Sequence, residues 1–251
     1  PSTMMIALVL ATPGTGWGGM EKHTAELAGA LTGLGHDVHV LAHPSYQAYF
    51  DGQSSFHSCP MQLGRRNPWL RYRIRRILNR LHPDVVHAQG SKAAAIVSRM
   101  RLPSECQKIG TVHGSKSTVK PFRELGKVIA VSTPVYQNLH HPRKYLVFNG
   151  IDLKQGDNAP SRAEGYQLPA AINVVAAGRL EPVKGFQRLI SGWPEVMARF
   201  PGAHLTIFGE GSQRPALLAQ IHQLDCGEST TLAGYQTDLM PILEQTDLFV
   251  I

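Results

Sequence analysis

An arginine and a lysine lie five positions apart in one short loop, where Arg179 and Lys184 are enclosed by glycines at positions 178 and 185. The preceding run Ile172–Ala177 is apolar and β-branched, which is typical of a buried parallel strand. Loops at the carboxyl ends of such strands face the crevice where open α/β sheets bind ligands. Because arginine offers a planar fork of donors and lysine a mobile point charge, this pair could hold a diphosphate. The alternative is a loop with two solvated cations.

The elements that would position this loop alternate between strand and helix along the chain, which predicts parallel sheets with crossover helices. The polar stretch 155–169 is rich in glycine and proline, and it is predicted to link an N-terminal domain, 1–154, to a C-terminal domain, 170–251. Strands are predicted at Ile6–Ala11, Asp37–Ala42, Asp84–Ala88, Lys108–Val112, Val128–Val131, Tyr145–Phe148, Ile172–Ala177, His204–Phe208, Thr230–Ala233 and Leu248–Ile251. Helices are predicted at Met20–Leu34, Trp69–Leu81, Lys92–Arg101, Pro134–Leu139, Phe186–Phe200, Arg214–Leu224 and Asp238–Gln245.

The composition argues against several classes of protein. With 251 residues, 43% of them hydrophobic, the chain can build the cores of two domains. The apolar run Met4–Ala11 is too short to span a membrane and lacks the flanks of a signal peptide, and no longer run exists. Three scattered cysteines without a Cys-x-x-Cys pair predict reduced thiols and a cytoplasmic location. The histidines form no helical i, i+4 pair and no cluster with cysteine, so no metal site is expected.

The net charge of +7 is unevenly distributed, because residues 1–150 carry +11 and residues 151–251 carry −4. This asymmetry predicts that the N-terminal part faces an anionic partner. Nucleic acid is not expected, since none of the usual RNA- or DNA-binding motifs occurs. An anionic membrane surface or a phosphorylated glycolipid fits better.

Much of the positive charge falls on one predicted helix, which begins with Asn67 as its N-cap and Pro68 at its first position. One face is apolar and should cover the sheet, with Leu70, Ile74, Ile77, Leu78 and Leu81. The remaining surface is predicted to contact anionic lipid, where each basic residue contributes about 1 kcal/mol, through Arg65, Arg66, Trp69, Arg71, Arg73, Arg75, Arg76 and Arg80. A solvated basic face is the alternative.

The glycine-rich turn after the first strand allows two interpretations. Gly14, Gly16 and Gly19 fit the Gly-x-Gly-x-x-Gly pattern of dinucleotide-binding proteins. That pattern expects an aspartate or glutamate at the end of the second strand, to hold the ribose. The second strand instead ends Leu41-Ala42-His43, without a carboxylate, which opposes an NAD-linked oxidoreductase.

Seven short motifs occur in one order between residues 18 and 211. They are Gly18-Gly19-Met20-Glu21, Asp84-Val85-Val86-His87-Ala88-Gln89-Gly90, Thr111-Val112-His113-Gly114, Val131-Ser132, Asn149-Gly150-Ile151-Asp152, the loop from Gly178 to Gly185, and Phe208-Gly209-Glu210-Gly211. Each is weak alone, but the ordered set resembles family 4 glycosyltransferases. The resemblance implies the GT-B fold, in which two Rossmann-like parallel-sheet domains face a cleft.

The resemblance also implies an activity. The N-terminal domain would bind the acceptor and the C-terminal domain a nucleotide diphosphate sugar, with retaining sugar transfer that needs neither metal nor cofactor. The acceptor would be a glycolipid or polysaccharide precursor in bacterial cell-surface synthesis, such as that of lipopolysaccharide. The enzyme would then be cytoplasmic, peripheral on the inner face of the cytoplasmic membrane. A non-catalytic relative that binds nucleotide sugars is a further alternative.

Site residues carry over from the family motifs position by position. Arg179 and Lys184 would be catalytic, because fixed cations stabilise the charge that develops on the departing phosphate. The donor would also be bound by Gly18 and Gly19, where backbone can approach a phosphate at a helix start, and by Gly209, Glu210 and Gly211. A solvated loop carboxylate is the alternative for Glu210.

On the acceptor side, the resemblance places Glu21 and His87 against the acceptor and the catalytic candidate His113 beside the transferred sugar. Glu21 could instead be a first-turn carboxylate that favours the helix dipole. His113 and His87 could be satisfied polar residues at strand ends.

The last residues, Thr246–Ile251, are predicted to be a strand with no element after it. In the family this strand leads into a Glu-x7-Glu segment that contacts the donor, followed by a helix that returns to the N-terminal domain. The second domain is therefore expected to be incomplete, and the 251-residue chain to be a fragment without appreciable transferase activity.

Overall fold

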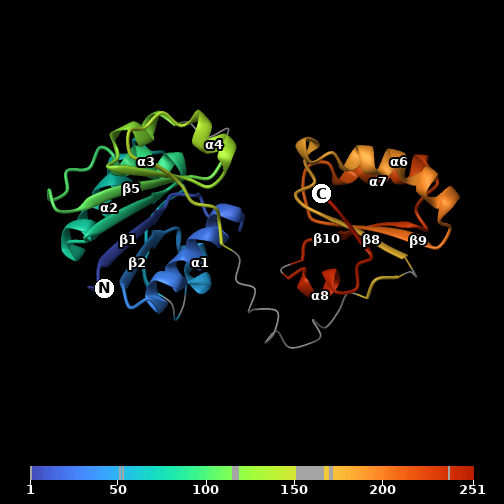
Figure 1. Ribbon diagram of the computed structural model, residues 1–251, viewed down its shortest axis with the longest axis horizontal. Coiled ribbons are helices and arrows are strands. Elements are labelled where there is room, and N and C mark those ends of the chain that lie inside the picture. The colour runs from blue at the N-terminus through green and yellow to red at the C-terminus, as the bar shows by residue number, and fades with distance from the viewer. Residues whose placement is uncertain are drawn as a thin grey trace. The chain divides into compact units, whose positions relative to one another are not determined.

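The computed structural model describes residues 2–50, 52, 54–114, 119–150, 167–169, 172–236 and 238–251. The chain forms two compact units, residues 1–151 and 152–251, each built on one sheet (Figure 1). The predicted linker 155–169 lies outside the described residues except for 167–169. None of the described helices has the length and apolar character that crossing a lipid bilayer would require.

The N-terminal unit contains a seven-stranded sheet in the order β3-β2-β1-β4-β5-β6-β7, with every neighbouring pair parallel. Its strands are β1 (Met5–Leu10), β2 (Asp37–Ala42), β3 (Ser55–Ser58), β4 (Val85–Gln89), β5 (Gln107–Val112), β6 (Lys127–Ala130) and β7 (Lys144–Leu146). Its helices are α1 (Gly19–Gly33), α2 (Pro68–Leu81), α3 (Gly90–Val97) and α4 (Thr133–Asn138), with 3-10 turns η1 (Pro44–Tyr49) and η2 (Lys120–Glu124). Because all pairings are parallel, the carboxyl ends of the strands lie along one edge of the sheet.

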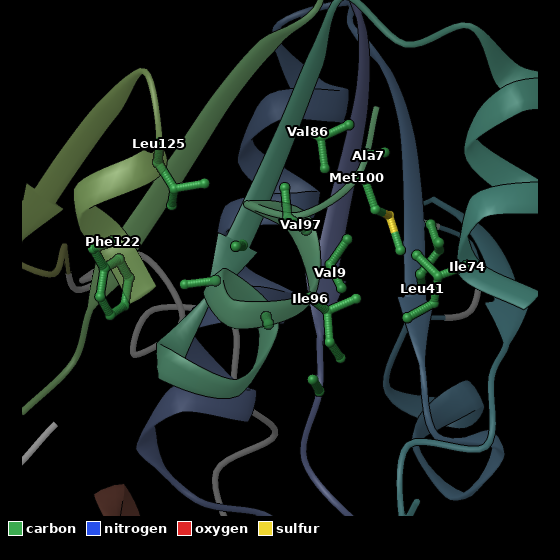
Figure 2. Packing of buried hydrophobic residues seen from close by; sticks show 14 of the residues in the cluster. Ala7, Val9, Leu41, Ile74, Val86, Ile96, Val97, Met100, Phe122 and Leu125 are labelled. Atoms are coloured by element: carbon green, nitrogen blue, oxygen red, sulfur yellow. The ribbon is translucent and has the colours of Figure 1, made fainter. Parts of the chain in front are cut away.

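This sheet is covered on both faces. Alternate residues of β1 enter different clusters: Ala7 and Val9 pack in the cluster that includes α2 and α3, whereas Leu8 and Leu10 pack in the cluster that includes α1. Figure 2 shows the first cluster, with Ile74 of α2 among its members. A strand buried on both faces is a nearly continuous apolar run, which is why the first strand could be predicted from sequence.

The C-terminal unit contains a four-stranded parallel sheet in the order β10-β9-β8-β11. Its strands are β8 (Ile172–Ala177), β9 (Ala203–Phe208), β10 (Thr230–Gly234) and β11 (Leu248–Val250). Its helices are α6 (Phe186–Arg199), α7 (Arg214–Gln223) and α8 (Met240–Leu243), and η3 (Pro182–Lys184) is a 3-10 turn. Trp193 of α6 is fully buried in the core against β9 and α7, and its indole N–H donates to Ser229 Oγ at 3.0 Å.

The predicted strands and long helices are confirmed, but several ends differ. β3 was not predicted, because four residues with two serines and a histidine give little strand signal and only pairing with β2 defines the strand. The helix expected at Lys92–Arg101 is Gly90–Val97, and the one expected at Asp238–Gln245 is only Met240–Leu243. Periodicity indicates the type of an element, whereas caps and neighbouring contacts set its ends.

Candidate functional site

The glycine-rich turn after β1 is closed by a carboxylate of its own helix. Gly18 is the N-cap of α1, and its N–H donates to Glu21 Oε2 at 3.0 Å. Glu21 is only 7% exposed. An acid in the first turn satisfies the N-cap N–H and interacts favourably with the helix dipole, so Glu21 has the structural role given above as its alternative. Its contact with acceptor hydroxyls stays a prediction.

The end of the second strand offers no acid for a nicotinamide ribose. The residue after β2 is His43, whose Nδ1 lies 2.8 Å from Ser45 Oγ. The His43 ring packs so closely on Gly14 that a β-carbon there would come within 2.1 Å of Nδ1. The turn therefore packs on an imidazole where a dinucleotide-binding protein would present its carboxylate.

His87 is a buried polar residue at the centre of the sheet. Its Nε2 lies 2.7 Å from the hydroxyl oxygen of Thr111, across the β4–β5 pair. Burial, reinforced by neighbouring His23 and His113, lowers the pKa of His87 to about 3. The ring is neutral at physiological pH, and its hydrogen-bond partner Thr111 belongs to the neighbouring strand β5.

His113 follows β5 and is fixed by a second cross-strand contact. Its Nε2 lies 2.8 Å from Gln89 Oε1, and Gln89 is 1% exposed. Because that oxygen only accepts, His113 donates its Nε2–H and keeps Nδ1 as an acceptor. Burial and His23 lower the pKa of His113 to about 4. A neutral imidazole in this state can accept a hydrogen bond from a hydroxyl group.

The third histidine of this cluster, His23 of α1, was missed by the sequence analysis. Its ring packs edge-to-face on His113 with centroids 5.0 Å apart, and burial lowers its pKa. The available signal was spacing, since His23 lies three residues after Met20 and therefore on the same helix face. Met20 itself meets α3, because a β-carbon at Gly90 (φ +79°) would lie 2.7 Å from the Met20 sulfur. The starts of α1 and α3 thus adjoin at the carboxyl edge of the sheet.

In the C-terminal unit, two loops at the carboxyl edge of the sheet are joined by backbone hydrogen bonds. Gly178 donates its N–H to the Phe208 carbonyl at 2.9 Å, and Leu180 donates to the Glu210 carbonyl at 2.9 Å. The loop after β8 is therefore fixed along the loop after β9.

Two glycines make this close approach possible. A β-carbon at Gly209, where φ is +141°, would lie 1.9 Å from the Gly178 carbonyl oxygen, and one at Gly211 would lie 2.5 Å from that of Leu180. Real β-carbons do not approach oxygen so closely, so both positions require glycine. The structure gives these glycines a packing role, and the predicted backbone contact with a nucleotide stays a prediction.

The two candidate cations, Arg179 and Lys184, are exposed on this joined pair of loops. Among the described residues, neither lies within 4.0 Å of a carboxylate. Their neighbour Glu181 accepts from Ser212 Oγ at 2.9 Å and from its N–H at 3.3 Å. These hydrogen bonds, with Arg179 nearby, lower the pKa of Glu181, so it stays ionised and ties the two loops together.

Glu210, predicted to contact the donor, has a partner of its own. Its Oε1 lies 3.3 Å from Nη1 of Arg214, the first residue of α7, and Arg214 Nη2 also donates to the Leu232 carbonyl at 3.1 Å. Both charged side chains are partly solvated.

α2 is oriented as predicted. Asn67 Oδ1 caps the helix by accepting from the N–H of Trp69 at 3.0 Å and of Leu70 at 3.1 Å. The predicted apolar face is turned inward, with Leu70, Ile74 and Leu78 buried and Ile77 and Leu81 partly buried. Trp69 and Tyr72 are exposed and stacked, with ring centroids 5.8 Å apart.

The predicted lipid-facing arginines lie on the outer side of α2 and its preceding loop. Arg71 is partly buried. The others are exposed, namely Arg65, Arg66, Arg73, Arg75, Arg76 and Arg80. Arg99 and Arg101, which were not among the predicted residues, line a hollow of about 420 Å³ with Arg66, Arg71 and Arg75. No residue of this set forms a salt bridge within the described part of the chain.

No set of three or more histidine, cysteine or acidic side chains in the described ranges could hold a metal ion. The three cysteines are free thiols.

Two solved structures share this architecture. A glycosyltransferase from Rickettsia africae matches with a TM-score of 0.77 at 18% identity, over 99% of this chain and 73% of its own. Anabaena Alr3699/HepE in complex with UDP-glucose matches with a TM-score of 0.72 at 16% identity, over 98% and 73%. This likeness shows the GT-B fold expected from the sequence.

Comparison at the level of sequence gives the family. Residues 17–155 match Glycosyltransferase Family 4, and residues 171–251 match Glycosyl transferases group 1. The chain belongs to Glycosyltransferase Family 4 and is a glycosyltransferase.

Two curated relatives are similar over most of the chain. The lipopolysaccharide core biosynthesis glycosyltransferase LpsE of Rhizobium meliloti is 23% identical over 93% of this chain and 68% of its own length. The GDP-mannose-dependent alpha-(1-6)-phosphatidylinositol monomannoside mannosyltransferase of Mycobacterium tuberculosis is 25% identical, over 89% and 66%.

Proposed function

We propose that this enzyme transfers a sugar from a nucleotide diphosphate sugar to a glycolipid or polysaccharide-precursor acceptor in bacterial cell-surface glycan synthesis. The observation that carries the proposal is the pair of joined loops, which hold Arg179 and Lys184 exposed at the carboxyl edge of the C-terminal sheet. Relatives named for lipopolysaccharide core and phosphatidylinositol mannoside synthesis support the acceptor class. A structure of HepE with UDP-glucose supports the donor class.

In this proposal the C-terminal unit binds the donor and the N-terminal unit the acceptor. Arg179 and Lys184 stabilise the charge on the departing diphosphate, and fixed cations do so without reorganisation during the reaction. His113 accepts a hydrogen bond from a sugar hydroxyl at Nδ1, while Gln89 fixes its tautomer. Retention of configuration is proposed from the family motifs alone.

We also propose that the basic side of the N-terminal unit lies against anionic lipid on the inner face of the cytoplasmic membrane. The arginines, which have no carboxylate within 4.0 Å in the described part of the chain, and the exposed Trp69–Tyr72 stack support this placement. Aromatic rings and cations both suit the lipid headgroup region. A glycolipid acceptor would be met at that surface.

Donor binding and transfer test the assignment of the joined loops. In a form of the enzyme that has transferase activity, Arg179→Ala or Lys184→Ala should slow transfer by about 100-fold, since losing one preorganised donor costs on the order of 3 kcal/mol of barrier. The matched control is Arg188→Ala, which removes an exposed cation of α6. Each variant is assayed with a panel of nucleotide sugars for transfer and, by calorimetry, for donor affinity. Equal rates and affinities in all three folded variants would exclude these loops as the donor site.

A further inference from the structure

A smaller basic hollow lies between α2 and the edge strand β3, away from the histidine cluster at β4 and β5. It measures about 190 Å³ and is lined by His57, Arg73, Arg76, Ile77, Arg80 and Leu81. No carboxylate is among its lining residues. Three guanidinium groups around one small space repel one another, so the arrangement favours an anion at its centre.

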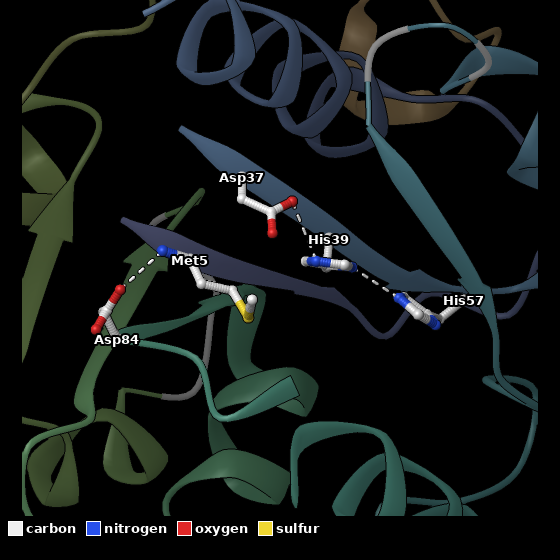
Figure 3. Close-up of polar contacts among 5 residues, drawn as sticks. All are labelled: Met5, Asp37, His39, His57 and Asp84. Atoms are coloured by element: carbon white, nitrogen blue, oxygen red, sulfur yellow. Dashed lines mark hydrogen bonds and ion pairs between the residues drawn. The ribbon is translucent and has the colours of Figure 1, made fainter. Parts of the chain in front are cut away.

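The histidine of this hollow ends a chain of polar contacts (Figure 3). His57 Nε2 lies 2.9 Å from His39 Nδ1, and His39 Nε2 lies 3.2 Å from Asp37 Oδ1. His39 is buried and His57 partly buried. The carboxylate is thus separated from the arginines by two imidazole rings.

The His39–Asp37 contact has the distance of an ion pair but not the geometry of a hydrogen bond. A carboxylate 3.2 Å away favours a proton on His39 Nε2. In that tautomer His39 accepts at Nδ1, and neutral His57 donates its Nε2–H and has a bare Nδ1. The groups around His57 are His39 and Asp37 of β2 and the three arginines of α2. Burial, then His39, Arg73 and Arg80, lower the pKa of His57, so it is neutral while the hollow is without an anion.

We propose that this hollow is a binding site for a phosphate monoester dianion and that binding transfers one proton from solvent to Nδ1 of His57. The arginine forks match phosphate oxygens, and the protonated ring adds one more donor. A free phosphate compound and a phosphomonoester lipid headgroup share this chemistry. The proposal is independent of the transferase reaction.

Isothermal titration with inorganic phosphate tests the site. Arg80→Gln should weaken binding by about tenfold or more, because it removes a charge-assisted hydrogen bond. Arg75→Gln is the matched control, since it removes the same charge from the same helix but does not line this hollow, and it should change affinity by less than about twofold. Equal losses in the two variants, or no phosphate binding by the parent protein, would overturn the proposal.

Proton uptake is measured separately with sulfate, which does not titrate near neutral pH. Calorimetry in buffers of different ionisation enthalpy should show up to one proton taken up per sulfate, with tighter binding at pH 6 than at pH 8. His57→Asn should abolish both the uptake and this pH dependence. Unchanged proton uptake in His57→Asn would overturn the role of this histidine.

Vesicles distinguish the two sources of phosphate. Phosphatidic acid is a monoester and phosphatidylglycerol a diester, so vesicles of equal surface charge differ in the group that fits the site. Preference for phosphatidic acid that Arg80→Gln removes would support a lipid headgroup, whereas phosphate binding without that preference would support a soluble ligand. Absence of both would contradict the proposal.

Discussion

The imidazoles of His23, His87 and His113 meet at the carboxyl edge of the N-terminal sheet and have lowered pKa values because they are buried. In the proposed function, neutral rings would contact a sugar as hydrogen-bond partners and not as cations or general acids. Gln89 and Thr111 each hold one ring across the β4–β5 pair. The proposed function therefore assigns stabilisation of the departing diphosphate to Arg179 and Lys184 of the C-terminal unit and not to these histidines.

The same lowered pKa values predict that acid destabilises the protein. The usual pKa of 6.5 applies to the unfolded chain, whereas His87 and His113 titrate at about 3 and about 4 when folded. Between these values the unfolded state binds more protons, so the free energy of unfolding falls as pH decreases from 6.5. At pH 5 the loss should be roughly 2 kcal/mol for each of the two histidines.

Urea unfolding at pH 7 and pH 5 measures this loss. His87→Gln removes one titrating ring and should reduce the pH dependence, even if the variant is less stable overall. His222→Gln removes an exposed histidine of α7 and should retain the parent dependence. If His87→Gln kept it as well, burial of His87 would not be its source.

At the scale of elements, backbone hydrogen bonds hold the loop after β8 against the loop after β9 in the C-terminal unit. Gly178 and Leu180 donate to the loop after β9, and Gly209 and Gly211 leave room for them. Glu181 and Ser212 add a side-chain tie between the same loops. The loop that presents the two cations is therefore rigid because of a second loop some 30 residues later in the sequence.

Gly209→Ala tests this dependence. The new β-carbon would meet the Gly178 carbonyl at a positive φ, so we expect destabilisation on the order of 2 kcal/mol and weaker donor binding. The control is Gly202→Ala, where no atom lies within 4 Å of the new carbon and φ is ordinary. Thermal unfolding and donor calorimetry are measured for both variants. Equal stability and equal donor affinity of the two would contradict the role of the loop contact.

At the scale of the whole molecule, the two parts of the chain differ in the sign of their net charge. The +11 of residues 1–150 is concentrated on α2 and its surroundings, whereas residues 151–251 carry −4. The arginines of α2 lack carboxylate partners within 4.0 Å in the regions that the structure describes. A surface of this kind attracts anionic bilayers over about one Debye length.

Vesicle cosedimentation should therefore show binding to anionic lipid that declines as salt rises, since exposed charges are screened over about 8 Å at physiological ionic strength. Replacing Arg66, Arg71 and Arg75 together by glutamine should abolish most of it. The matched variant replaces three other cations of the same unit, Lys120, Arg123 and Arg143. If both triple variants lost vesicle binding equally, the net charge of the unit would account for the binding. If the parent protein showed no preference for anionic lipid, the membrane proposal would be excluded.

Most of the elements and the family could be predicted from the sequence, whereas the strand β3 could not. Periodicity gave the face of α2 that contains Leu70, Ile74 and Leu78, and Asn67 was recognisable as its cap, because both depend on residues near in sequence. The family assignment also depended on short local motifs, which were recognised one by one and by their order along the chain.

Contacts between distant elements could be seen only in the folded chain. The contact of His23 with His113, the tie of Gly209 to Gly178 and the chain from Asp37 through His39 to His57 each join different elements. Strand register and helix packing set such contacts, and both depend on which distant segments pair in the folded chain. For this reason Arg179 and Lys184 could be selected as candidates from the sequence. The contacts between loops and between imidazole rings at the candidate sites were seen only in the folded chain.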